Sequence, residues 1–252
     1  MNGFTIPSLK VTMIWLFGIM VICFAIGGVL IILESDNHEK NLEKQERIHI
    51  PSSGIEKAQV NLEIDSGTVN LTSGPGPDLI QGQVIVNGVL PSPRLSHTIT
   101  NRTGNIVIER SKNFMQDIIG GEENWDIELQ NKTPTSLLVS LGTGELNITS
   151  GKMNLSELGI ENGAGSLSLD LHEWEGKRLQ VKIVNGVGEM TLLFPEKSDI
   201  SVFLERGIGN SIVSGFTANN QGYSHESVSP GNSEIIVHIS QGLGDLTLKT
   251  VP

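Results

Sequence analysis

Five Gly-x-Gly pairs recur in the second half of this chain, each within the same apolar frame. The residues five and three positions before the first glycine are aliphatic in all five copies. Those four and six positions after it are aliphatic in every copy except one, where they are Ser211 and Val213. A motif repeated in this way is typical of one structural unit that stacks on copies of itself. The pairs are Gly142/Gly144, Gly163/Gly165, Gly186/Gly188, Gly207/Gly209 and Gly242/Gly244.

The spacing of the apolar residues predicts β-strands rather than helices. Apolar positions two apart place side chains alternately on opposite faces, which is the period of a strand. The step across each glycine pair is odd, so the alternation changes phase there, as it does at a tight corner with positive φ. We therefore predict an all-β, repetitive β-solenoid-like domain of stacked strand–glycine corner–strand units, in which all ten glycines are structural corners.

The repeat predicts how this β domain is divided. The first four pairs are 21, 23 and 21 residues apart, whereas the last step is 35 residues. We expect a regular β-repeat half at 135–252 with a loop insertion at 215–232. A β-rich but less regular first half is expected at 48–134, because the segment that begins at Gly67 parallels the one that begins at Gly144. Strand-like runs also occur at 60–64, 84–86, 106–108 and 127–129.

The residue after each second glycine is a carboxylate in three of the five copies. If the repeats stack in sequence order, carboxylates and neutral residues alternate over the first four copies, which reduces like-charge repulsion. The nine-residue calcium-binding repeat is absent, and no GxGxxG precedes a helix, so we predict neither a metal nor a cofactor. These residues are Glu145, Ser166, Glu189, Asn210 and Asp245.

One segment near the N-terminus has the composition of a membrane span. Residues 11–33 contain no charged side chain, and 23 residues are enough for a helix to cross a bilayer of about 30 Å. The sequence predicts a short tail at 1–10, a transmembrane helix at 11–33 and a charged stalk at 34–47. Asp36/Lys40 and Glu43/Arg47 have helix-supporting spacing in the stalk. The protein is thus expected to be a single-pass protein of the cell membrane.

Flanking charge and sequons bear on which side of the membrane the C-terminal domain lies. Lys10 precedes the span while three cations follow it closely, which alone favours a cytoplasmic domain, but long domains cross largely regardless of flanking charge. Asn-x-Ser/Thr sequons are compatible with an extracytoplasmic domain, which is the location we expect. The sequons are at Asn70, Asn101, Asn131, Asn147 and Asn154.

Charge and motif content argue against two classes of function. The net charge is −11, and every acidic residue follows the span, so nucleic acid is not an expected partner. The histidines have no metal-ligand spacing, and neither HExxH nor GxSxG occurs, so we do not predict an enzyme. The polar insertion carries Phe216, Tyr223 and His225, which are the candidate binding residues because exposed aromatic side chains often make contacts.

Two glycine repeats carry a resemblance to known families. The segments beginning Gly163-Ala-Gly-Ser-Leu and Gly186-Val-Gly-Glu-Met resemble toast-rack and LiaF-like (cell-wall-active antibiotic response) domains of prokaryotic envelope proteins. They are also similar to putative-adhesin β-solenoid families. The likeness covers roughly residues 55–252 and implies a membrane-associated, non-enzymatic domain, which in some members restrains an envelope-stress sensor kinase. This chain departs from the LiaF-like pattern in having one expected span instead of several.

These observations lead to one main hypothesis and two alternatives. We expect a membrane-anchored, non-enzymatic β-solenoid that acts by protein or cell-envelope contact. The first alternative is a cytoplasmically facing regulator of a membrane sensor kinase with a LiaF-like role. The second is an envelope polysaccharide-active enzyme, which requires clustered carboxylates or basic residues that the sequence does not display. The sequence makes no prediction about oligomeric state.

Overall fold

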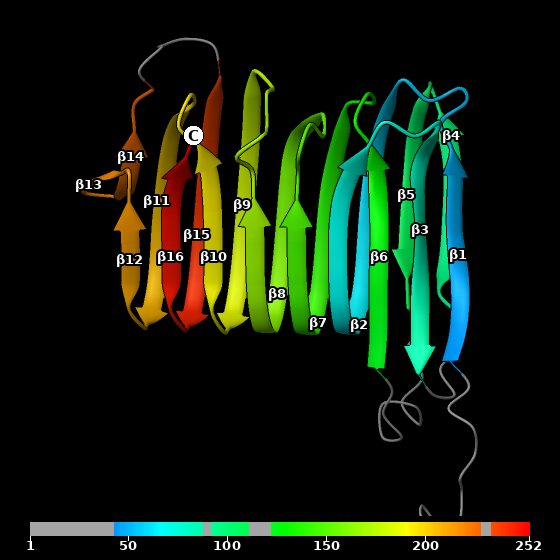
Figure 1. Ribbon diagram of the computed structural model, residues 1–252, viewed down its shortest axis with the longest axis horizontal. Coiled ribbons are helices and arrows are strands. Elements are labelled where there is room, and N and C mark those ends of the chain that lie inside the picture. Colours follow the sequence, from blue (N-terminus) through cyan, green and yellow to red (C-terminus); the bar gives the residue numbers. More distant parts are fainter. Residues whose placement is uncertain (1–42, 88–91, 111–121, 228–232) are drawn as a thin grey trace, which may run out of the picture. The chain divides into compact units, whose positions relative to one another are not determined.

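The computed structural model describes residues 43–87, 92–110, 122–227 and 233–252. These form a single body of β-strands, Glu43–Pro252, joined into one hydrogen-bonded sheet (Figure 1). The all-β prediction is therefore confirmed. The strands are β1 (Glu43–Pro51), β2 (Lys57–Gly74), β3 (Asp78–Asn87), β4 (Arg94–Thr100), β5 (Thr103–Glu109), β6 (Glu122–Gln130), β7 (Thr135–Thr149), β8 (Leu155–Asp170), β9 (Arg178–Val187), β10 (Met190–Pro195), β11 (Asp199–Ile208), β12 (Ser211–Ser214), β13 (Thr217–Asn219), β14 (Gly222–His225), β15 (Glu234–Leu243) and β16 (Leu246–Val251).

The expected transmembrane helix at 11–33 lies outside the described residues, as do the tail at 1–10 and residues 34–42 of the expected stalk. Within the described residues, no helix has the length and apolar composition needed to cross a membrane. The described end of the stalk, residues 43–47, is extended and pairs with β3. The spacing of Glu43 and Arg47 would support a helix, but the burial of Ile48 and Ile50 at alternate positions favours a strand, and that strand begins at Glu43.

Each repeat is a coil with two arms. The first arm ends at the glycine pair, the chain reverses, and the second arm returns, as the corners along the lower edge of Figure 1 show. Neighbouring coils are parallel and in register, so that Leu137 of β7 lies beside Leu158 of β8, and Gly144 lies beside Gly165. The inward-facing apolar side chains of the arms are buried, and they stack on one another from coil to coil between the two arms. The predicted strand–glycine corner–strand unit is confirmed.

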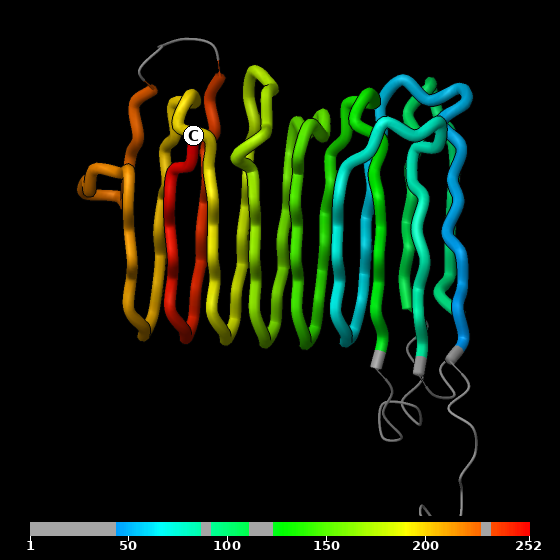
Figure 2. Tube along the Cα trace, viewed as in Figure 1, coloured from blue at the N-terminus to red at the C-terminus, as the bar shows by residue number. Residues whose placement is uncertain are grey.

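The coils are not stacked in sequence order. β15 lies between β9 and β11, with Val237 beside Val181 on one side and Val202 on the other. β16 likewise lies between β10 and β12. Figure 2 shows the red C-terminal coil between the yellow and orange coils that precede it in the chain. The last repeat therefore occupies the next-to-last place in the stack.

This order explains one sequence exception and corrects one expectation. The coil that contains Ser211 and Val213 is at the end of the stack, where its second arm has a neighbour on one side only, β16. Fewer buried positions are needed there, so the break in the apolar pattern follows from its place. The expected alternation of carboxylates is wrong, because Met190 pairs with Leu246 and this register places Glu189 beside Asp245.

The first half contains one regular coil and an irregular end. β2 passes through a corner at Gly67, which lies beside Gly144, and its Leu71 lies beside Ile148, so the predicted parallel between these segments is confirmed. Beyond β2, the row of second arms continues as β6, β3 and β1, and the row of first arms continues as β5 and β4. Several of these pairings are antiparallel, which accounts for the weaker repeat in this half of the sequence.

Candidate functional site

Both glycines of each Gly-x-Gly corner are required by the close stacking of coils. At the second glycine φ lies between +125° at Gly165 and +150° at Gly209, a region that L-residues rarely adopt. A Cβ on Gly165 would lie 1.8 Å from the carbonyl oxygen of Gly144. Gly163 has no left-handed φ, but a Cβ there would lie 2.3 Å from the Gly142 oxygen. The corners are thus places where backbone lies directly on backbone.

The residue between the two glycines points to solvent and forms a row along the corners, which we call the corner ridge. In spatial order the corner ridge reads Ser66, Thr143, Ala164, Val187, Leu243 and Ile208. Its last three members are aliphatic, and their exposed fractions are 49%, 47% and 75%. Ile212, at the start of the second arm of the end coil, is 63% exposed. We call Val187, Leu243, Ile208 and Ile212 the apolar end of the corner ridge.

Carboxylates flank the apolar end. Glu189 and Asp245 follow the second glycines of their corners and are exposed, as is Glu205 on the first-arm side. Asp245 is held in place, because its Oδ1 accepts hydrogen bonds from the Asn210 backbone N–H at 2.7 Å and from Asn210 Nδ2 at 3.3 Å. The cation nearest in sequence, Arg206, donates to the carbonyl oxygens of Asn210 and Gly244 and to the Ser211 hydroxyl. Its guanidinium is therefore committed to the corner itself.

A row of buried amide side chains supports the corners from inside. Asn162 Nδ2 donates to Asn185 Oδ1 at 2.7 Å and to the Gly165 carbonyl at 3.3 Å. Asn185 Nδ2 and Gln241 Nε2 both donate to the Gly188 carbonyl, at 3.2 and 3.3 Å. Carbonyl groups turned inward at a corner need such partners, since an unpaired buried polar group costs about 1–3 kcal/mol. The amide row makes the corner ridge a rigid surface.

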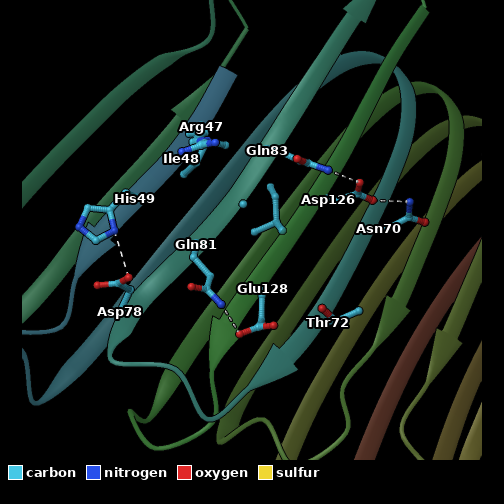
Figure 3. A pocket seen from close by; sticks show the side chains of 12 residues that line it. Arg47, Ile48, His49, Asn70, Thr72, Asp78, Gln81, Gln83, Asp126 and Glu128 are labelled. Atoms are coloured by element: carbon cyan, nitrogen blue, oxygen red, sulfur yellow. Dashed lines mark hydrogen bonds and ion pairs between the residues drawn. The ribbon is translucent and has the colours of Figure 1, made fainter. Parts of the chain in front are cut away.

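A second surface is a polar groove on the outer face of β1, β3, β6 and β2 (Figure 3). Its side chains largely bind one another. Gln81 donates to Glu128 at 2.6 Å, and His49 Nδ1 lies 3.0 Å from Asp78 Oδ2. Asp126 accepts from both Asn70 and Gln83. Because these groups already satisfy one another, the groove offers a ligand fewer unpaired groups than its composition suggests.

The predicted binding residues Phe216, Tyr223 and His225 lie at the end of the stack. The described part of the 215–232 insertion contains the β13–β14 hairpin, which pairs with β11. Phe216 and Tyr223 are partly buried against the core, and Phe216 meets Phe194 edge to face at 6.1 Å. His225 contacts Phe216 at 5.8 Å, and its ring nitrogens lie 2.7 Å from the Gly215 carbonyl oxygen and 2.9 Å from that of Glu196. In this position the three residues close the open end of the core, and their binding role stays a prediction.

A buried ion pair lies at the other end of the stack. Arg110 Nη2 is 2.7 Å from Glu123 Oε1, and the Trp125 indole donates to Glu123 Oε2 at 2.9 Å. Burial raises the pKa of Glu123, while Arg110 and the Trp125 hydrogen bond act in the opposite direction. Among the described residues no group of three histidine, cysteine or acidic side chains is arranged to hold a metal ion.

The architecture defines a class of protein, the β-solenoids built from parallel two-armed coils with glycine corners. Residues 37–193 match the family of the N-terminal domain of toast_rack, DUF2154. Because this match covers more than half of the chain, the protein belongs to that family. The predicted resemblance to toast-rack domains is thereby confirmed.

Two solved structures are reported for comparison. The chain is similar to a putative cell adhesion protein from Clostridium sporogenes ATCC 15579, with a TM-score of 0.72 and 27% identity over 83% of this chain and 100% of that chain. A putative adhesin from Bacteroides fragilis NCTC 9343 is 11% identical over 82% of this chain and 96% of that chain, with a TM-score of 0.25. No curated protein matches this chain.

Sequence reasoning missed the apolar end of the corner ridge, although the signal was present. The residue between the glycines reads Thr143, Ala164, Val187, Ile208 and Leu243 along the chain. Reading those positions as solvent-facing needs only the alternation of the flanking strands. The adjacency of Glu189 and Asp245 had no such signal, because it depends on the order of the coils.

Proposed function

We propose that this protein is a membrane-anchored, non-enzymatic toast-rack domain that acts by contact with a protein or another component of the cell envelope. The observation that carries the proposal is the apolar end of the corner ridge. Contiguous exposed aliphatic side chains on a soluble domain commonly mark an interaction site. The name of the Clostridium sporogenes relative, a putative cell adhesion protein, agrees with a contact role.

The membrane anchor and the outside location rest on the sequence. Residues 11–33 carry no charge and are long enough to span a bilayer. The non-enzymatic role is supported by the absence of catalytic motifs from the sequence and by membership of the toast-rack family. An acidic surface keeps such a domain soluble next to a membrane of the same sign.

Site-specific photocrosslinking in intact cells that express the full chain tests the contact role. A photoreactive residue at position 208 is expected to give a discrete crosslinked product, whereas one at Ile99, which is 47% exposed on β4, is not. Equal labelling at both positions, or none at position 208, contradicts a contact through the corner ridge. Protease added outside the cells should digest the domain, and full protection there contradicts the outside location.

A further inference from the structure

We infer that the apolar end of the corner ridge binds a protein segment whose aliphatic side chains are flanked by lysine or arginine. The inference deepens the proposed contact function, on which it rests, by giving the partner a chemistry. It depends on an apolar row that the fold does not require and on carboxylates that border that row.

The stack itself shows that the aliphatic side chains are not needed for the corner. The same backbone turn is made with Ser66, Thr143 and Ala164 at the equivalent position. At these three corners φ of the glycine that follows is +125° to +132°, and at the aliphatic corners it is +135° to +150°, so all six lie in the same region. The corner therefore does not need the aliphatic side chains of Val187, Leu243 and Ile208, which expose apolar surface to water. Such exposure is expected where a partner covers the surface.

Rigidity favours this part of the molecule as a docking surface. Coils lie about 4.8 Å apart, so the three aliphatic ridge residues extend over roughly 10 Å. The backbone beneath them is fixed by glycine-on-glycine stacking and by the hydrogen bonds of Asn185 and Gln241 to Gly188. A surface that is already ordered loses little conformational entropy on binding.

Charge decides between the partners that an apolar surface could accept. Glu189 and Asp245 lie side by side next to the row, and Glu205 lies on its first-arm side, while the guanidinium of Arg206 is engaged in the corner. A second copy docked on the same surface would place these carboxylates against one another, and an anionic bilayer would be repelled. A partner with lysine or arginine beside its aliphatic residues complements both features.

Peptide binding to the full chain in nanodiscs of phosphatidylcholine tests this chemistry. The probe is the fluorescent peptide KKIVLIKK, and the two control peptides replace its lysines by glutamate or its aliphatic residues by serine. We expect the lysine peptide to bind at least about tenfold more tightly than either control, and its affinity to fall as salt is raised. Equal affinities for the lysine and glutamate peptides overturn the inference.

Variants of the protein locate the binding. V187A/L243T/I208T installs residues that other corners of this chain already carry, so melting should be unchanged while affinity falls at least about tenfold. E189Q/D245N should weaken binding several-fold and reduce its salt dependence. The matched control is L95S/I99S, which removes two exposed aliphatic side chains from the edge strand β4. If this control loses as much affinity as the ridge variant, the inference fails.

Two further outcomes identify a different occupant and refute the inference. One is a dimer of the wild-type chain that V187A/L243T/I208T abolishes in sedimentation. The other is binding to phosphatidylglycerol vesicles that the same variant abolishes.

Peptide binding without crosslinking from position 208 in cells refutes the proposed function alone. Crosslinking without preference for the lysine peptide refutes the partner chemistry alone.

Discussion

Alanine substitution at three glycines separates the two reasons why the corners need glycine. Gly54 has φ of +78°, and the nearest atom to an added Cβ is 4.0 Å away, so Gly54→Ala meets backbone strain only. Gly163→Ala meets the Gly142 oxygen at 2.3 Å without a left-handed φ. Gly165→Ala meets both, with φ of +125° and the Gly144 oxygen at 1.8 Å. The three variants therefore form a matched series.

The structure sets the expected order of destabilisation. Left-handed strain alone costs about 1–2 kcal/mol, which is the expectation for Gly54→Ala. An ordinary carbon–oxygen contact needs more than about 3 Å, so Gly163→Ala must push neighbouring coils apart, and overpacking of this kind costs about 1–3 kcal/mol. Gly165→Ala combines a clash of this kind with strain in a region that is open almost only to glycine, which gives about 3–5 kcal/mol.

Guanidinium denaturation of the full chain, followed by far-ultraviolet circular dichroism, gives the three free energies of unfolding. The reasoning is refuted if Gly165→Ala unfolds at the same denaturant concentration as Gly54→Ala. It is also refuted for the first glycines if Gly163→Ala is as stable as the wild-type chain.

Three further predictions, one of them with a control substitution, concern interactions beneath or away from the exposed side chains of the corner ridge. His225→Ala removes the contacts to the Gly215 and Glu196 carbonyls, so the amides of β14 should exchange hydrogen markedly faster, whereas His238→Ala, which removes a ring stacked on Phe203, should leave them unchanged. Asn185→Ala removes two hydrogen bonds, although Asn162 keeps its bond to the Gly165 carbonyl and the Gly188 carbonyl keeps its bond from Gln241. At about 0.5–1.5 kcal/mol for each bond, the variant should lose about 1–3 kcal/mol in chemical denaturation. Because burial raises the pKa of Glu123 above its ordinary 4.5, the folded state keeps that proton to higher pH than the unfolded chain, and stability from this group is lost as pH rises through the folded pKa. Glu123→Gln should flatten that segment of the profile of unfolding free energy against pH, and an unchanged slope would contradict the assignment.

The sequence predicted the coil because the interactions that form a coil are made by residues close together in the chain. Alternation of apolar residues, the odd step at the corner and the glycines all act within about 20 residues, and the register of Leu137 with Leu158 follows from them. The position of β15 is not local. Its inward residues Val237 and Ile239 fit beside β9 or beyond β11 equally well by pattern, so only the three-dimensional structure distinguishes the two orders.

The surface was harder to predict than the core, for a similar reason. Phe216 and Tyr223 stand in a polar segment, which favours exposure, yet the hairpin that holds them lies over the open end of the core, where apolar side chains are partly buried. The sequence does not show where the core ends, because that requires knowing that the coil of β11 is the last in the stack. The same knowledge is needed to see that Glu189 and Asp245 are neighbours.

The inserted position of the last coil has a consequence for biosynthesis. Until residues 234–252 leave the ribosome, β9 has an unsatisfied edge, and β11 offers it a parallel strand of the same period with glycines at matching positions. A nascent chain can close that gap by placing β11 directly on β9, and the native arrangement then requires the two coils to separate and admit β15. The native order of coils therefore depends on β15 and β16 entering between strands that are synthesised before them, a non-local step of the kind that slows folding.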